Sequence, residues 1–224
     1  MSETIDTFGF VTAIKQEPQQ LRRRMGIIVS VETGYTITIQ LAGDTTSFSG
    51  IKYFGHYPPK VGAQVWLDTD GADIVAIGAI AGLGGAVPAG LTIKAANQSI
   101  ATASNTTITW PAPATDTFGI WDAANNRWVV PFDGMWLINT TLIWAANATG
   151  ARAAYIMQGA NIISISRGQA TSGVTTIMNC STIAKATKND NFSIQGYQSS
   201  GGALNVETNA NICNFSISYL GPAA

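Results

Sequence analysis

The chain is poor in charge and in histidine. Only 11% of its 224 residues are charged, against roughly a quarter in an average soluble domain. The net charge is −1, so there is no global field to attract DNA or anionic lipid, and we expect no nucleic-acid partner. His56 is the only histidine, and it stands in a loop without a nucleophile beside it. Histidine-based nucleophilic catalysis is therefore disfavoured.

Long hydrophobic runs are also missing. No stretch reaches the ~20 apolar residues of a membrane span, and glycines and a proline interrupt the longest weakly polar run, residues 74–91. The first residues show no basic region followed by an apolar core, so we expect no secretory signal. We predict no membrane insertion. A protein of this kind that acts outside a cell would leave it inside something else, such as a virion released by lysis.

The two cysteines, Cys180 and Cys213, lie in expected strands without a CxxC spacing. Buried free thiols are the favoured interpretation, and a disulfide stays open if those strands are neighbours. The acidic segment 68–73 lacks the sixth-position glycine and twelfth-position glutamate of a calcium loop, so we interpret it as a turn between strands. No phosphate loop, dinucleotide fingerprint or zinc spacing occurs, so we expect no cofactor and no metal.

Runs of alternating apolar residues are what the sequence has in abundance. In residues 125–145, a turn with Pro131, Asp133 and Gly134 separates two runs of aromatic and β-branched residues, which predicts a hairpin. Alternation predicts that one face of the second run fills a core. That face carries Trp136, Ile138, Leu142 and Trp144.

The spacing around this turn resembles that of the C1q/TNF-like jelly-roll family. The residues that carry the resemblance are Gly119, Trp121, Trp128, Pro131, Gly134, Trp136 and Ile138, and the final segment 214–220 resembles the family's last strand. The resemblance implies a jelly-roll domain over residues 91–224 that forms a homotrimer. It also implies subunit contacts on the second face of residues 135–145, where Leu137, Asn139 and Thr141 are too mixed for a core and too apolar for free water.

The N-terminal part has a different pattern. Residues 25–81 show five short alternating strands, the first two joined across Glu32-Thr-Gly34, which suits a small closed barrel. The order with Pro59, Val61, Gly62 and Trp66 is similar to the OB-like barrels of bacteriophage baseplate and tail-spike proteins, and the resemblance implies an attachment domain. Residues 82–90, rich in glycine, predict a linker.

Residues 1–24 are expected to form an N-terminal arm. It ends in three arginines, Arg22, Arg23 and Arg24. We interpret them as a solvated end, with a docking contact on an acidic partner as the alternative.

Ligand-binding candidates in the second domain are few. Trp110 and Trp121 adjoin expected loops, where an indole often provides a platform for a sugar ring. Five acidic residues occur beyond the linker, and turn chemistry explains them better than a pair of catalytic carboxylates. These residues are Asp116, Asp122, Asp133, Asp190 and Glu207.

The sequence thus predicts an all-β protein without enzymatic activity. The preferred hypothesis is a trimeric bacteriophage tail or baseplate protein, assembled in the bacterial host cytoplasm and located in the virion. Residues 1–81 would attach it to other virion proteins, and the jelly roll would adhere to a host-surface glycan. A capsid decoration or collar protein is the alternative, and a glycan depolymerase is the third.

Overall fold

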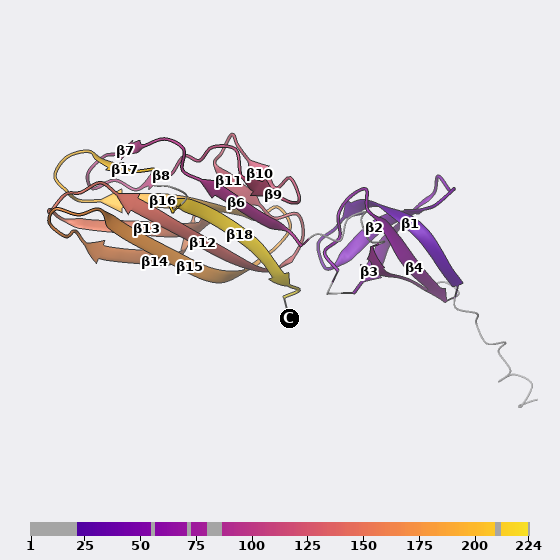
Figure 1. Ribbon diagram of the computed structural model, residues 1–224. Helices are drawn as coiled ribbons and strands as arrows, with labels where there is room; N and C mark the ends of the chain where they lie inside the picture. Colours follow the sequence, from indigo (N-terminus) through magenta and orange to yellow (C-terminus); the bar gives the residue numbers. More distant parts are fainter. Residues whose placement is uncertain (1–21, 55–56, 71–72, 80–86, 209–211, 224) are drawn as a thin grey trace, which may run out of the picture.

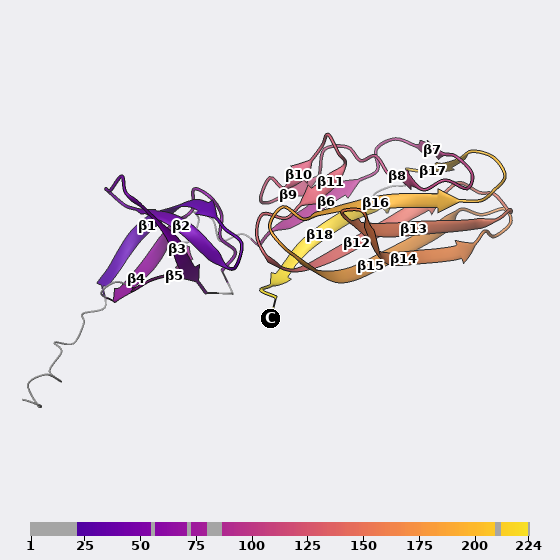
Figure 2. The same ribbon diagram turned by 180° about the vertical axis from the view of Figure 1, so that it is seen from behind.

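The computed structural model describes residues 22–54, 57–70, 73–79, 87–208 and 212–223. Within these ranges the only regular elements are strands, as the sequence predicts. They form a small barrel and a larger two-sheet sandwich, and the barrel lies beyond one end of the sandwich (Figures 1 and 2). No helix among the described residues has the length and apolar character needed to cross a membrane.

The barrel is closed and contains five strands in the order β1-β2-β3-β5-β4. Its neighbours pair antiparallel except β3 and β5, which are parallel. Alternate positions point inward, and the interior is filled mainly by Ile28, Ile37, Ile39, Val65 and Leu67. The strands are β1 Arg22–Val31, β2 Thr36–Leu41, β3 Ser47–Tyr53, β4 Gln64–Asp70 and β5 Asp73–Ala79.

The sandwich has two antiparallel sheets. The first contains β6 Ala89–Ile93, β7 Gln98–Ile100, β9 Thr115–Asp116, β12 Gly134–Trp144, β15 Thr176–Ala186, β17 Leu204–Val206 and β18 Asn214–Gly221. The second contains β8 Thr106–Thr107, β10 Trp121–Asp122, β11 Arg127–Val129, β13 Ala151–Gln158, β14 Asn161–Gln169 and β16 Asn191–Gln198.

The strand order makes this sandwich a jelly roll. Eight strands form its framework, in chain order β6, β11, β12, β13, β14, β15, β16 and β18. The first, eighth, third and sixth are neighbours in one sheet, and the second, seventh, fourth and fifth are neighbours in the other. This alternation between two layers is the double Greek key of a jelly roll. The predicted all-β barrel followed by a jelly roll is confirmed.

Aromatic side chains fill the space between the two sheets. Trp136, Ile138, Leu142 and Trp144 are all fully buried, as their alternation predicts. At about 25 cal/mol per Å² and 150–250 Å² per aromatic side chain, each buried ring contributes up to about 4–6 kcal/mol. Trp128 packs so closely on β6 that a Cβ atom at Gly90 would lie 2.6 Å from its ring. This close approach explains a glycine inside a strand.

The predicted hairpin in residues 125–145 is wrong. β11 pairs with β10 and β16, whereas β12 pairs with β15 and β18, so the two runs belong to different sheets. The intervening turn carries the chain across the sandwich. Phe132 within it is fully buried between the sheets, 6.2 Å from the ring of Phe118 and 5.7 Å from that of Trp136.

Strand boundaries differ from the expected domain boundaries at two places. β1 begins at Arg22, inside the expected arm, because its pairing with β4 continues to that residue: Arg22 lies opposite Thr69 and Arg24 opposite Leu67. β6 begins at Ala89, inside the expected linker, because Gly90 pairs with Ile217 of β18. Residues 1–21, His56 and residues 80–86 lie outside the described part of the chain.

Candidate functional site at the domain junction

The barrel and the jelly roll meet at the turn between β11 and β12. Asp133 in this turn is buried, and each of its carboxylate oxygens accepts a backbone hydrogen bond. Gly34 N of the barrel donates to Oδ2 at 2.7 Å, and Lys188 N donates to Oδ1 at 2.8 Å. Hydrogen bonds to a charged acceptor are stronger than neutral ones. One carboxylate therefore ties the β1–β2 turn of the barrel to two turns of the jelly roll.

The end of the jelly roll is held by the same barrel turn. Tyr35 has a φ of 61° beside Gly34 at 77°, so two consecutive residues of this turn adopt the left-handed conformation. The Tyr35 hydroxyl accepts a hydrogen bond from Ala223 N at 2.7 Å and donates one to Ala223 O at 3.1 Å. A left-handed conformation costs a tyrosine about 1–2 kcal/mol. The contacts with Ala223 offset that cost.

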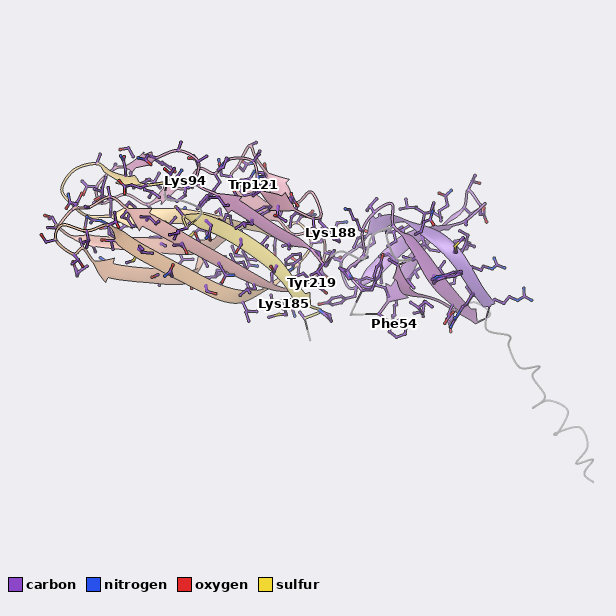
Figure 3. All side chains as sticks on the ribbon, viewed as in Figure 1. Phe54, Lys94, Trp121, Lys185, Lys188 and Tyr219 are labelled. Carbon is purple, nitrogen blue, oxygen red and sulfur yellow. The ribbon has the colours of Figure 1, made fainter. Side chains whose placement is uncertain are left out.

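Two lysines cross the junction in opposite directions. Lys60 of the barrel donates to the carbonyl oxygen of Thr117 at 3.2 Å, and its Nζ lies 5.0 Å from the centre of the Phe118 ring. Lys188 of the jelly roll donates from Nζ to the carbonyl oxygen of Val31 in the barrel. Figure 3 shows Lys188 at the end of the sandwich that faces the barrel. Each domain thus places an ammonium group against the backbone of the other.

A hollow of about 270 Å³ opens between these two lysines. Barrel residues on one side and jelly-roll residues on the other line it: Ser30, Val31, Pro59, Lys60, Val61, Phe118, Pro131 and Lys188. A second hollow of about 380 Å³ shares Phe118, Pro131 and Lys188 with the first and continues along the jelly roll to Trp121. We call the two hollows together the junction cleft.

Two tyrosine hydroxyls near the junction are buried and do not ionise near neutral pH. Burial, and then the neighbouring Tyr35, raises the pKa of Tyr219 to about 12. Burial also raises the pKa of Tyr53, with smaller contributions from Tyr219 and Asp133. Both hydroxyls therefore stay neutral at physiological pH.

The two predicted ligand-binding tryptophans lie in different environments. Trp121 is half-buried, packs edge to face on Trp128 with ring centres 4.7 Å apart, and lines the junction cleft. Trp110 is only 7% exposed, lies 5.9 Å from the Phe215 ring and is capped by Lys94, whose Nζ is 5.9 Å from the indole. Trp110 is part of the core, so Trp121 is the one of the two that remains a ligand-binding candidate.

The predicted subunit contacts, Leu137, Asn139 and Thr141, alternate on the outward side of β12 and are partly exposed. Asn139 Oδ1 accepts from Ser181 Oγ at 2.6 Å, and Thr141 Oγ1 donates to Asn179 Oδ1 at 2.8 Å. The residues that the strand register places in the same rows are all uncharged: Ala89, Leu91, Ile93, Asn179, Ser181, Ile183, Asn214, Ser216 and Ser218. We call these positions the neutral face.

Four of the five acidic residues in the jelly roll are occupied in shaping turns. Asp116 accepts hydrogen bonds from three backbone N–H groups, and Asp122 bonds Asn125 and pairs with Arg127 at 2.8 Å. Asp190 accepts from Thr187, and Asp133 holds the junction as described above. These are the turn roles that the sequence predicts for them.

Both cysteines are buried free thiols, which confirms the favoured interpretation. The acidic segment 68–73 belongs to the ends of two paired strands, because Asp70 of β4 lies opposite Asp73 of β5, and residues 71–72 lie outside the described part of the chain. The cleft itself was not predicted. Lys60, Phe118 and Lys188 carry no recognisable motif, and their proximity arises only from the docking of two domains.

Known proteins offer limited comparison. No protein-family model and no curated protein sequence matches the chain. Among solved structures, Eiger TNF from S. frugiperda is 8% identical with a TM-score of 0.48, covering 62% of this chain and 95% of that one.

Murine APRIL is 9% identical with a TM-score of 0.47, covering 60% of this chain and all of its own. The globular domain of zebrafish complement 1qA is 9% identical with a TM-score of 0.43, covering 59% of this chain and 96% of that one. The strand order alone, rather than these values, establishes the jelly roll.

Proposed function

We propose that this chain is a homotrimeric structural protein of a bacteriophage tail or baseplate. The barrel attaches it to other virion proteins, and the jelly roll is displayed outward for adhesion to a host-surface glycan. The observation that carries the trimer is the neutral face. It spans four strands of one sheet without a charged residue in its rows, and Ile183 within it is 57% exposed.

A surface of this kind suits a subunit interface. Interface cores are depleted of charged residues, because an unpaired charge would lose its hydration on assembly. The side-chain hydrogen bonds from Ser181 to Asn139 and from Thr141 to Asn179 satisfy polar groups within the face itself. A partner subunit could therefore cover them at low cost.

The exterior of the barrel supports a role in attachment. Met25, Ile27 and Val29 alternate on the outward side of β1, and Trp66 lies opposite Met25 on β4. All four are 39–44% exposed. Contiguous exposed apolar side chains mark interaction surfaces. The barrel order β1-β2-β3-β5-β4 with its parallel β3–β5 pair also supports the OB-like interpretation on which the attachment role rests.

The trimer is tested by molar mass in solution. Light scattering at micromolar concentration should give three times the 23.5 kDa chain mass. Asn139→Asp places one negative charge per subunit on the neutral face, keeps the acceptor for Ser181, and should shift the protein toward monomer. Gln195→Glu, outward on the opposite sheet, is the matched control and should remain trimeric. A monomeric parent protein would contradict the proposal.

Adhesion is tested on particles. Antibodies against the jelly roll should label intact virions, and particles lacking residues 91–224 should adsorb poorly to the host. Three sites per trimer would raise avidity by roughly 10²–10⁴ where geometry permits simultaneous contact. Unchanged adsorption would reject adhesion and favour a purely structural decoration or collar role.

A further inference from the structure

The junction cleft has the form of a ligand site. Small-molecule sites are concave, mostly apolar, about 300–1,000 Å³ in volume, and often lie between domains. The hollow of about 270 Å³ between Lys60 and Lys188 and its continuation of about 380 Å³ toward Trp121 fit that description. Together the two hollows have room for a short, chain-like ligand that contains more than one ring.

Two lysines line the cleft without forming an ion pair in the described part of the chain. Within the described residues, the ion pairs join Arg23 to Asp68 and Arg127 to Asp122, and neither Lys60 nor Lys188 takes part in one. A lysine ammonium has three donors. Each of these two groups makes one identified hydrogen bond, to a backbone carbonyl.

The acidic groups near the cleft, Asp116 among them, accept hydrogen bonds from other groups and form no ion pair with Lys60 or Lys188. Both oxygens of Asp133 accept backbone N–H groups, and Glu32 accepts the hydroxyl of Ser30. Asp122, at the far rim of the second hollow, is paired with Arg127 at 2.8 Å. An anion placed between the two lysines would therefore meet donors from both domains.

The walls of the cleft are aromatic and aliphatic. Phe118 lines both hollows, and its ring lies 6.2 Å from the ring centre of Phe132 with Lys60 Nζ above it. Trp121 also lines the second hollow. Flat rings suit the apolar face of a sugar, whereas a phosphate chain would leave these walls without a partner.

We infer that the junction cleft binds a carboxylate-bearing saccharide, with the carboxylate between Lys60 and Lys188 and the sugar rings against Phe118 and Trp121. This inference rests on the proposed glycan adhesion and names the ligand class. The lysines come from different domains, so the bound saccharide bridges barrel and jelly roll.

The experiment compares two ligands that differ only in charge. Linear tri-galacturonate and its carboxyl-reduced trisaccharide are titrated into the full chain, and binding is measured by calorimetry at low and high salt. The acidic sugar should bind at least tenfold more tightly, and salt should weaken it. Equal binding of the two sugars would overturn the inference.

Variants locate the site. Lys60→Gln and Lys188→Gln should each weaken tri-galacturonate binding about tenfold, and Lys60→Arg should retain most of it. Lys52→Gln removes the same charge from an exposed barrel position outside the cleft and should have no effect. Melting temperatures show whether each variant is folded. An equal loss in Lys52→Gln would overturn the inference.

The outcomes separate this inference from the proposed function. If particles adsorb through the jelly roll but the chain binds only neutral glycans, the inference fails and adhesion stands. If tri-galacturonate binds in the cleft but particles lacking residues 91–224 adsorb normally, the inference stands and the adhesion proposal fails. Binding of no saccharide at all overturns the inference.

Discussion

The barrel and the jelly roll bury opposite kinds of side chain. The barrel interior is mainly aliphatic, with Ile37, Ile39 and Leu67 at its centre, because five strands close around a narrow space. The jelly roll places two sheets about 10 Å apart and fills the gap with whole indoles. Its largest fully buried side chains include Trp128, Trp136, Trp144, Phe132, Phe192 and Phe215.

The two domains also differ in the polarity of their exposed faces. The barrel exposes a stripe of Met25, Ile27, Val29 and Trp66, whereas the neutral face of the jelly roll is half polar. Substitutions within each domain and at the junction test this comparison.

The largest effect is expected from Trp136→Ala. The indole contacts Phe132 and Tyr219, with ring centres 5.7 and 5.2 Å away. Removal of a buried aromatic ring costs about 3–5 kcal/mol, which should unfold the jelly roll at lower urea. Ile39→Val in the barrel is the control at about 0.5–1.5 kcal/mol. A loss below about 1 kcal/mol in the tryptophan variant would contradict the aromatic core.

Asp133→Asn should uncouple the two domains. The amide keeps one acceptor and turns its N–H₂ toward a backbone donor, so one hydrogen bond to a charged group, worth about 1.5–3 kcal/mol, is lost. Calorimetry should then resolve two transitions where the parent gives a more cooperative one. Asp44→Asn, in an exposed barrel turn where Asp44 accepts from Thr46 N, is the matched control. Two transitions already present in the parent would show that the junction does not couple the domains.

Gly90→Ala should destabilise the jelly roll. The new Cβ would lie 2.6 Å from the Trp128 ring, and overpacking of a core costs about 1–3 kcal/mol. Gly202→Ala meets no atom within 4 Å and should have little effect. Chemical denaturation measures both, and equal stability of the two variants would show that β6 can move away from the ring.

Tyr35→Phe tests the contact between the barrel turn and the C-terminal segment. It removes the hydroxyl that bonds Ala223 and keeps the ring, so we expect a loss of about 0.5–1.5 kcal/mol per hydrogen bond. Tyr197→Phe, on the outward face of β16, removes a hydroxyl far from the junction. A stability no lower than that of the Tyr197 variant would exclude a contribution from the Ala223 contact.

Alkaline pH should lower the free energy of unfolding of both domains, and this effect should be absent at neutral pH. Burial raises the pKa of Tyr57 in the barrel and of Tyr219 in the jelly roll to about 12. An unfolded tyrosine ionises near pH 10. The unfolded state therefore loses protons first, and stability falls as pH rises from about 10 through about 12. Urea midpoints at pH 9, 10 and 11 measure this, and a flat profile would contradict it.

Much of the fold follows from alternation along the sequence. A period of two residues determines which side chains share a face, so the inward positions of Trp136, Ile138, Leu142 and Trp144 were predictable from the sequence alone. The same pattern predicted partial exposure for Leu137, Asn139 and Thr141. Turn chemistry also predicted structural roles for Asp116, Asp122 and Asp190.

Alternation does not specify a strand's neighbours, and the wrong predictions have this cause. The turn at residues 131–134 has the composition of a hairpin, yet it joins two sheets because Phe132 is buried between them. The short strand β6 resembled a linker, because the glycine that Trp128 requires at position 90 is also a residue typical of flexible segments. In both cases an aromatic ring packed between the sheets determined the local structure.

The sequence by itself determined the strand-rich class of this protein, its two-part organisation and the faces that form the cores. The tertiary structure alone decided which strands pair and where the two domains touch. Lys60 and Lys188 meet in one cleft because Asp133 and Tyr35 dock the domains through hydrogen bonds. Such contacts join residues far apart in the chain, and local periodicity carries no information about them.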